Sequence, residues 1–205
     1  MSKFFNLLER YHSDLPNYKL KTFKSLYKIY KEINKKVNLI SRKDFENFYL
    51  HHIIHSLSIL KFNLIKEKKL KIIDLGTGGG LPGIPLSIVY EKNDFILVDS
   101  IKKKIQSIDK IINHLNIKNV KTINDRAENL NNEADIIVCR SVSSIDNIIA
   151  WSKNLVKKKS KLILLKGGNV NKELKNIRLR STIYKLDDIY SENYFLDKKI
   201  IEIYI

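Results

Sequence analysis

Short apolar runs alternate with helical stripes along the chain from residue 69 onward. The runs are KIIDL, DFILVD, VKTIN, ADIIVCR and SKLILLKG, and each is typical of a buried strand. Between them apolar residues recur at helical spacing, as in Ile101, Ile105, Ile108 and Ile112. Strands that alternate with helices predict an α/β fold, a mostly parallel sheet with helices on both of its faces.

The last two apolar segments have a different pattern. TIYKLDD and KKIIEIYI alternate apolar and polar residues, which is typical of half-exposed strands. We therefore expect the sheet to end in an antiparallel pair at the C-terminus.

The first 62 residues have a helical pattern without glycine. Aromatic residues such as Phe23 and Tyr30 recur at helical spacing, and such residues more often form a core than a platform for nucleic acid. Ser41 is placed to cap the next helix. We expect residues 1–62 to form a helical extension that packs as one unit with a domain of residues 63–205.

Composition excludes several protein classes. A chain of 205 residues with 43% hydrophobic residues is ordinary for a globular protein of one domain and an extension. No apolar stretch of 18 residues is free of charge, and the charged N-terminus lacks a signal-peptide core, so we expect no membrane association and a cytoplasmic location. The single cysteine, Cys139, excludes an intrachain disulfide framework.

The net charge of +16 favours a polyanionic partner, RNA or DNA. A compositional bias toward lysine, isoleucine and asparagine gives the same surplus without any such partner, so the charge does not decide the question alone. The candidates for phosphate contacts are lysines of the N-terminal helices and of the segment after LVDS: Lys19, Lys21, Lys24, Lys28, Lys31, Lys35, Lys36, Lys103 and Lys104.

Five of the seven glycines lie within residues 76–83, directly after the KIIDL run. Glycine lets a backbone adopt positive φ and approach a ligand closely. In a doubly wound sheet, the loop after a central strand lies where ligands bind. A phosphate-binding P-loop is excluded, because no Gly-Lys-Ser/Thr ending is present.

Two loop patterns remain. Gly78, Gly80 and Gly83 satisfy the G-x-G-x-x-G spacing of dinucleotide loops, which is a weak signal by itself. Asp74, Gly76, Gly78 and Gly80 satisfy D-x-G-x-G-x-G, the pattern of S-adenosylmethionine-dependent methyltransferases of the Rossmann-like class.

Two strand-end carboxylates have alternative roles. Asp99 ends the run FILVD, where a carboxylate accepts hydrogen bonds from both ribose hydroxyls of a cofactor. Alternatively, Asp99 caps the helix that begins near Ile101. Asp74 positions either the loop backbone or the methionine end of the cofactor, unless it is only a solvated strand end.

Seven segments together resemble a known family. They are NLIS at 38, HHIIHSL at 51, DLGTGGGLPGIPLSI at 74, LVDSIKKK at 97, NDRAENL at 124, CRSV at 139 and LLKGG at 164. In this order they resemble the GidB/RsmG family, which methylates N7 of a guanine in 16S ribosomal RNA. The resemblance implies a class I methyltransferase fold with a seven-stranded sheet, S-adenosylmethionine as cofactor, 16S rRNA or the small ribosomal subunit as partner, no metal, and a monomer.

The same resemblance assigns roles to matching residues. Gly76 and Leu81 line the methionine and loop side of the pocket. Ala127 and Glu128, in the RAE triplet, meet the adenine. Arg140 follows the run ADIIVC and lies beside the cofactor and the active site.

The reaction implied by the resemblance needs little acid–base chemistry. Guanine N7 has an in-plane lone pair and no proton, so it attacks the sulfonium methyl in line without a general base. Cys139 has the surroundings of a small buried hydrophobe, not of a nucleophile. We expect Arg140 and Lys166, at two strand ends, to guide an unpaired guanine, because N7 is out of reach in the narrow major groove of A-form RNA.

The segment HHIIHS at residues 51–56 departs from the family pattern, which is usually Arg-His-Ile-x-Asp-Ser. His51 and His55 thus stand where the family has Arg and Asp, and Ser141 replaces an alanine. Two histidines four residues apart can seat a metal, but no third ligand is evident, so we predict none.

Three other functions remain open from the sequence. The glycine loop also fits an NAD(P)-dependent oxidoreductase. A non-catalytic RNA-binding module with this fold is a second alternative, and a methyltransferase that acts on a small molecule is the third.

Overall fold

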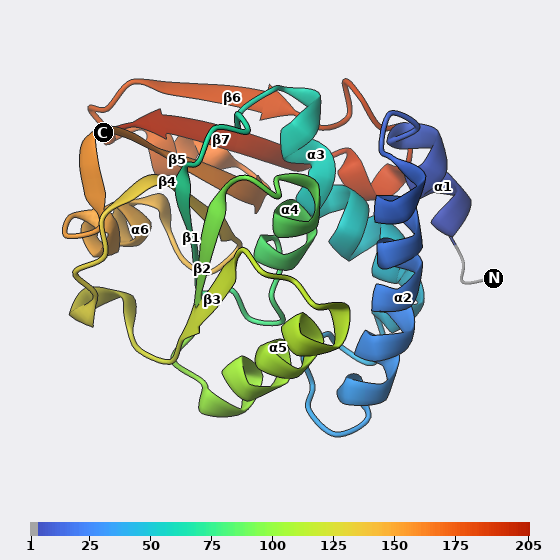
Figure 1. Cartoon of the computed structure of the whole chain (residues 1–205). Coiled ribbons are helices and arrows are strands. Elements are labelled where there is room, and N and C mark those ends of the chain that lie inside the picture. Colours follow the sequence, from blue (N-terminus) through green and yellow to red (C-terminus); the bar gives the residue numbers. More distant parts are fainter. Residues whose placement is uncertain (1–3) are drawn as a thin grey trace.

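A seven-stranded sheet runs through the centre of the protein (Figure 1). The structure is a computed structural model and describes residues 4–205. The strand order is β3-β2-β1-β4-β5-β7-β6. The strands are β1 (Lys71–Leu75), β2 (Asp94–Val98), β3 (Val120–Ile123), β4 (Ala134–Arg140), β5 (Val156–Gly167), β6 (Ser181–Lys185) and β7 (Lys198–Tyr204).

The direction of the strands confirms the predicted fold class. β1 to β5 are parallel to one another, whereas β7 is antiparallel to both of its neighbours, β5 and β6. The five apolar runs therefore form the parallel part of the sheet, and the two alternating segments form the antiparallel pair at the C-terminus.

Helices cover both faces of this sheet. In Figure 1, α2 lies to the right of the sheet and α6 to its left. The helices are α1 (Phe5–Tyr11), α2 (Asn17–Asn34), η1 (Phe45–Asn47), the π-helix η2 (Phe48–Ile54), α3 (His55–Lys61), α4 (Gly83–Val89), α5 (Lys102–Leu115), η3 (Ala127–Asn129), α6 (Ile145–Ser152), α7 (Val170–Leu174) and η4 (Asn193–Phe195).

The alternation of side chains along each strand gives the sheet two hydrophobic layers. In β1, Ile72 packs into the layer that includes residues of α2, α3, α4 and α5. Its neighbour Ile73 packs into the opposite layer, with residues of α6 and α7. Strands buried on both faces are continuously apolar, which explains why their sequences show runs instead of alternation.

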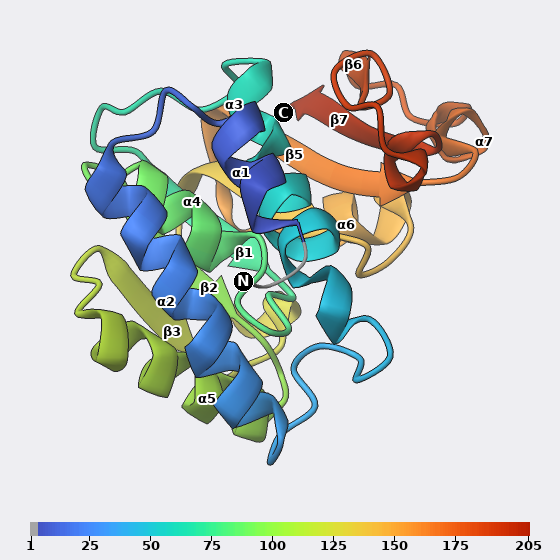
Figure 2. The same cartoon turned by 90° about the vertical axis from the view of Figure 1, so that its right-hand side faces the viewer.

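The N-terminal helices share a core with the sheet. Phe23, Leu26 and Tyr30 of α2 are fully buried in the same layer as Ile72 of β1 and Ile108 of α5. Figure 2 shows α2 running across α4 and α5 on this face. Hydrophobic packing therefore continues across the predicted boundary between residues 62 and 63, and the division into two units stays a prediction.

The start of the helix after α2 was wrongly placed by the sequence. Ser41 is not an N-cap, because η1 begins only at Phe45 and Asp44 occupies the N-cap position. The carbonyl of Ser41 instead accepts the backbone N–H of Asp44 in a turn. Ser41 lies in a loop whose shape depends on contacts from α2, as described below.

None of the helices in residues 4–205 combines the length and the hydropathy needed to cross a bilayer.

His12, between α1 and α2, is a buried titratable group outside the sheet. Its side chain is 1% exposed, and neither ring nitrogen has a hydrogen-bond partner among the described residues. Burial, assisted by the positive charge of Lys61, lowers the pKa of His12 to about 4. The folded protein therefore holds this imidazole in its neutral form.

This burial predicts a specific loss of stability in acid. Between the unfolded pKa of 6.5 and the folded pKa of about 4, only the unfolded chain protonates His12, so acidification favours unfolding. When the pH is lowered from about 7 to about 5, we expect the free energy of unfolding to decrease in both proteins. The decrease should be about 2 kcal/mol smaller in His12→Phe than in the wild type, because the variant has no imidazole to protonate. Urea titrations at the two pH values measure the difference, and equal falls in both proteins would contradict it.

Candidate active site

A cavity of about 450 Å³ opens at the carboxyl ends of the parallel strands. It lies beside β1, where the strand order turns back, and this is the place where open α/β sheets bind ligands. Cavities of roughly 300–1,000 Å³ are typical of small-molecule sites. The lining residues used in the argument below are Gly76, Asp99, Ala127, Glu128, Arg140 and Trp151.

The glycine loop lines this cavity at Gly76, and Gly78 lies beside it. Gly76 and Gly78 have positive φ, 68° and 59°. A Cβ on Gly76 would lie 2.7 Å from a methyl carbon of Val142, so the space for a side chain is already filled there. A Cβ on Gly78 would meet nothing closer than 3.9 Å, so this backbone faces open space and a ligand can approach it.

Asp74, at the end of β1, holds the two ends of the loop together. Its Oδ2 accepts a hydrogen bond from the hydroxyl of Thr77 at 2.5 Å and another from the N–H of Gly83 at 2.8 Å. Its Oδ1 is buried and has no partner among residues 4–205. Burial raises the pKa of Asp74 to about 6. These contacts support loop positioning, whereas contact with a cofactor stays a prediction.

Asp99 lines the cavity at the end of β2 and joins two segments. Its Oδ2 accepts the N–H of Gly78 at 2.9 Å, and its Oδ1 accepts the N–H of Ile101 at 2.8 Å. The second contact lies directly before α5, but the N-cap of this helix is Ile101 and no side chain caps it, so the alternative role of Asp99 as the helix cap is wrong. Its carboxylate nevertheless lines the cavity, where it can also contact a ligand.

Residues of η3 and α6 form a further part of the cavity lining. Ala127 and Glu128 line the cavity from η3, and their contact with an adenine stays a prediction. Trp151 lines it from α6, and the sequence analysis missed this residue. Its being the single tryptophan of the chain is the one sequence signal that singles it out.

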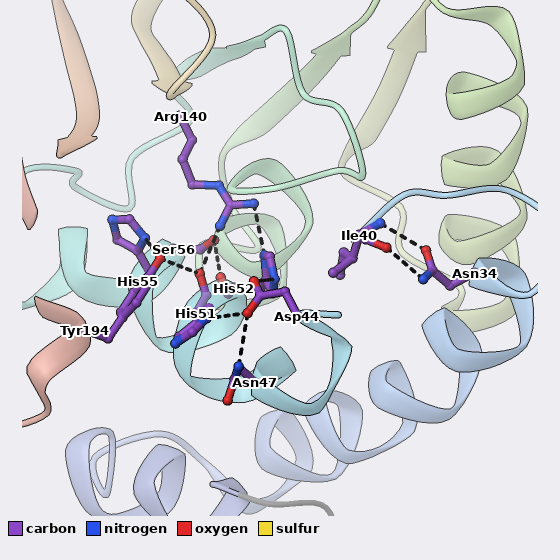
Figure 3. Close-up of polar contacts among 10 residues, drawn as sticks. All are labelled: Asn34, Ile40, Asp44, Asn47, His51, His52, His55, Ser56, Arg140 and Tyr194. Atoms are coloured by element: carbon purple, nitrogen blue, oxygen red, sulfur yellow. Dashed lines mark hydrogen bonds and ion pairs between the residues drawn. The ribbon is translucent and has the colours of Figure 1, made fainter. Parts of the chain in front are cut away.

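Arg140 lines the cavity at the end of β4, but its guanidinium turns toward η2 (Figure 3). Nη1 donates a hydrogen bond to the carbonyl of His51 at 3.1 Å, and Nη2 donates to Nδ1 of His52 at 3.3 Å. Burial lowers the pKa of Arg140 from its ordinary value, although arginine stays charged at neutral pH. Arg140 therefore lines the cavity as predicted, but the sequence did not indicate that its guanidinium points toward η2.

Half of the ten predicted site residues do not line the cavity. Leu81 is buried in the hydrophobic layer, and Lys166 is bound to Glu173 at 2.6 Å and to the carbonyl of Ser143 at 2.9 Å. The five that lie behind or beside the cavity are Asp74, Gly78, Gly80, Leu81 and Lys166. Their functional roles stay predictions.

The remaining polar candidates have structural partners. His51 binds Asp44 at 2.6 Å and His55 binds the hydroxyl of Tyr194 at 2.9 Å, so the two histidines do not converge. Within residues 4–205, no three His, Cys, Asp or Glu side chains are grouped to hold a metal. Burial raises the pKa of Cys139 to about 12, so its thiol is protonated and unsuited to nucleophilic attack.

From the contacts of Asp74 we predict that stability depends more on its hydrogen-bond-accepting oxygen than on its negative charge. Asp74→Asn keeps an oxygen for Thr77 and Gly83, so we expect a free energy of unfolding within about 1 kcal/mol of the wild type at neutral pH. Asp74→Ala leaves both donors buried without an acceptor, and we expect a loss of about 2–4 kcal/mol. Urea denaturation measures both values, and an Asn variant as unstable as the Ala variant would show that the charge itself is required.

Comparisons with known proteins point to one family. The family model described as rRNA small subunit methyltransferase G (GidB) matches residues 19–193. "Ribosomal RNA small subunit methyltransferase G" of Christiangramia forsetii is 40% identical over 201 residues, which cover 95% of this chain and 94% of that protein. The protein of the same name from Bacteroides thetaiotaomicron is 37% identical, with 95% of this chain and 97% of that protein covered.

Solved structures agree in fold. A SAM-dependent methyltransferase from Aquifex aeolicus matches with a TM-score of 0.58 at 16% identity, over 77% of this chain and 93% of that one. TYW2 from M. jannaschii, solved in complex with AdoMet, matches with a TM-score of 0.55 at 12% identity, over 72% and 73%. These comparisons favour the methyltransferase pattern of the glycine loop over the dinucleotide pattern. With the family model matched over most of its length, the chain belongs to the rRNA small subunit methyltransferase G (GidB) family.

Proposed function

We propose that this protein methylates N7 of a guanine in 16S rRNA, with S-adenosylmethionine as the methyl donor. Family membership makes it a methyltransferase of the small-subunit rRNA type. The observation that carries the proposal at the site is one cavity, at the switch point of the sheet, that is lined by Gly76 of the glycine loop, by Asp99 and by Arg140.

The residues around the cavity fit the cofactor. Each Asp99 oxygen has two acceptor positions and uses one on a backbone N–H, so the carboxylate can also accept both ribose hydroxyls. The open backbone at Gly78 allows close approach. Ala127 and Glu128 receive the adenine on the wall completed by Trp151. S-adenosylmethionine supplies a methyl group on a positively charged sulfur.

The protein contributes positioning, not proton transfer. Guanine N7 offers a lone pair and carries no proton, so a side chain that holds it in line with the methyl group is sufficient for catalysis. Arg140 is the charged group at the end of β4 suited to this task. Lys166 supports the same edge of the sheet from β5, through its contacts with Ser143 and Glu173.

The substrate is 16S rRNA or the small ribosomal subunit, with the target guanine unpaired. The charge of +16 suits a phosphate backbone, and exposed lysines of α2 such as Lys28 and Lys31 can contact it. Affinity for RNA should fall as the salt concentration rises. We propose that the protein acts in the cytoplasm as a monomer and without a metal.

Mapping of N7-methylguanine tests the reaction directly. We expect small-subunit rRNA from cells that contain the protein to carry one N7-methylguanine that is absent after deletion of its gene. The purified protein with S-adenosylmethionine should restore this modification to the unmethylated RNA or subunit. An unchanged map after deletion would contradict the proposed function.

Variants of Asp99 test the cofactor site. We expect Asp99→Ala to weaken S-adenosylhomocysteine binding about 10- to 100-fold, because two charge-assisted hydrogen bonds are lost. The matched control is Asp94→Ala, an exposed carboxylate at the other end of β2, which should bind normally. Calorimetry measures both affinities. Binding of NADH in place of S-adenosylhomocysteine would instead support an oxidoreductase.

A further inference from the structure

The guanidinium of Arg140 is a buried cation with two uncharged acceptors. These are the carbonyl of His51 and the Nδ1 atom of His52. Two carboxylates, Asp74 and Asp44, favour its charged form from a longer distance. A buried charge needs such compensation, because an isolated one is unfavourable. Asp44 contacts Arg140 through an intervening residue.

His52 connects the two charged groups. Its Nδ1 faces Nη2 of Arg140 at 3.3 Å, and its Nε2 faces Oδ2 of Asp44 at 2.9 Å (Figure 3). Arginine has only donors, so Nδ1 of His52 must accept, and its proton must be on Nε2. Asp44 accepts that proton in a hydrogen bond and thereby fixes the tautomer that can receive Arg140.

Asp44 is itself held in one orientation. Its Oδ1 accepts hydrogen bonds from Nδ1 of His51 at 2.6 Å and from the side-chain amide of Asn47 at 3.1 Å. The neighbouring residues His51 and His52 both reach this one carboxylate from the π-helix η2, a rare helix type that is frequent at functional sites.

Tyr194 completes the arrangement from the C-terminal part of the chain. Its ring stacks on His51 with centroids 3.8 Å apart, and its hydroxyl donates to the carbonyl of His51, which also accepts Nη1 of Arg140. The hydroxyl in turn accepts from Nδ1 of His55 at 2.9 Å. Both histidines that depart from the family pattern are therefore used in holding the acceptors of Arg140.

We propose that Asp44 is a positioning residue for Arg140. Through the tautomer of His52, Asp44 holds the guanidinium in the orientation in which Arg140 guides the guanine. Asp44 acts together with His51, His55 and Tyr194, and two of these, His51 and His55, stand where the family pattern has Arg and Asp. This proposal rests on the proposed function, in which Arg140 guides the guanine.

Asp44→Asn is the first test. Oδ1 receives two donors, so the amide oxygen should occupy that position and turn its NH2 group toward Nε2 of His52. His52 must then carry its proton on Nδ1. Two N–H donors, from Nδ1 of His52 and Nη2 of Arg140, would then face each other, and their hydrogen bond would be lost. We expect kcat for rRNA methylation to fall about tenfold, since a hydrogen bond to a charged group is lost, with S-adenosylhomocysteine affinity and Tm near wild type. Glu46→Gln, an exposed neighbour, is the matched control.

A double-variant cycle tests whether Asp44 acts through His52. The side-chain oxygen of His52→Asn lies close to the position of Nδ1, so this variant retains an acceptor for Arg140 without a contact to Asp44. We expect it to keep most of the activity, whereas His52→Leu loses it. Asp44→Asn should have no further effect on kcat in the His52→Asn background. An equal tenfold fall in both backgrounds would overturn the relay.

The tautomer of His52 gives a readout independent of activity. Long-range ¹H–¹⁵N NMR spectra of the wild type should show the proton of His52 on Nε2, and those of Asp44→Asn should show it on Nδ1. A proton on Nδ1 in the wild type, or an unchanged spectrum in Asp44→Asn, would overturn the proposal. Absence of rRNA methylation by the wild type would instead overturn the proposed function, and the spectra would still decide the role of Asp44.

Discussion

The buried carboxylate of Asp74 is the group on which the arrangement of the site depends. One of its oxygens binds Thr77 near the start of the glycine loop and Gly83 at the start of α4. A Cβ at position 83 would lie 2.7 Å from this oxygen, so only glycine lets α4 begin so close to β1. Burial of this carboxylate raises its pKa, because the charged form loses its hydration. The two hydrogen bonds that it accepts fix the shape of the loop.

From this fixed loop the remaining parts of the site follow on neighbouring strands. The loop presents the N–H of Gly78 to Asp99 at the end of β2. On the other side of β1, β4 brings Arg140 to the same edge of the sheet. Because β2, β1 and β4 are adjacent parallel strands that end at one edge of the sheet, Asp99, Gly76 and Arg140 line one cavity.

Features that depend on neighbouring residues in the chain were predictable from the sequence, and features that depend on distant residues were not. The strands were predictable because burial on both faces requires continuous apolar residues, as in the KIIDL run. The glycine loop was predictable because positive φ favours glycine, as at Gly76. The direction of Arg140 was not, because it depends on His51 and His52, about 90 positions earlier in the chain. Ser41 was misassigned for the same reason. The preference of serine for N-cap positions is a local property, whereas the loop that contains Ser41 is held by Asn34 of α2. Trp151 was missed since a half-buried tryptophan in a helical stripe is indistinguishable from a core residue by sequence alone.

The contacts of α2 join the N-terminal helices to the loops around the cavity. Asn34, which is buried, binds the backbone of Leu39 and Ile40 through three hydrogen bonds and so fixes the loop that follows α2. That loop places the carbonyl of Leu39 against Gly79, where a Cβ would approach to 3.0 Å, and the hydroxyl of Tyr30 donates to the carbonyl of Gly79. The loop also ends at Asp44. One short segment thus contacts the glycine loop at one end and, through Asp44, the residues that bind Arg140 at the other, so the helical extension contributes to the geometry of both.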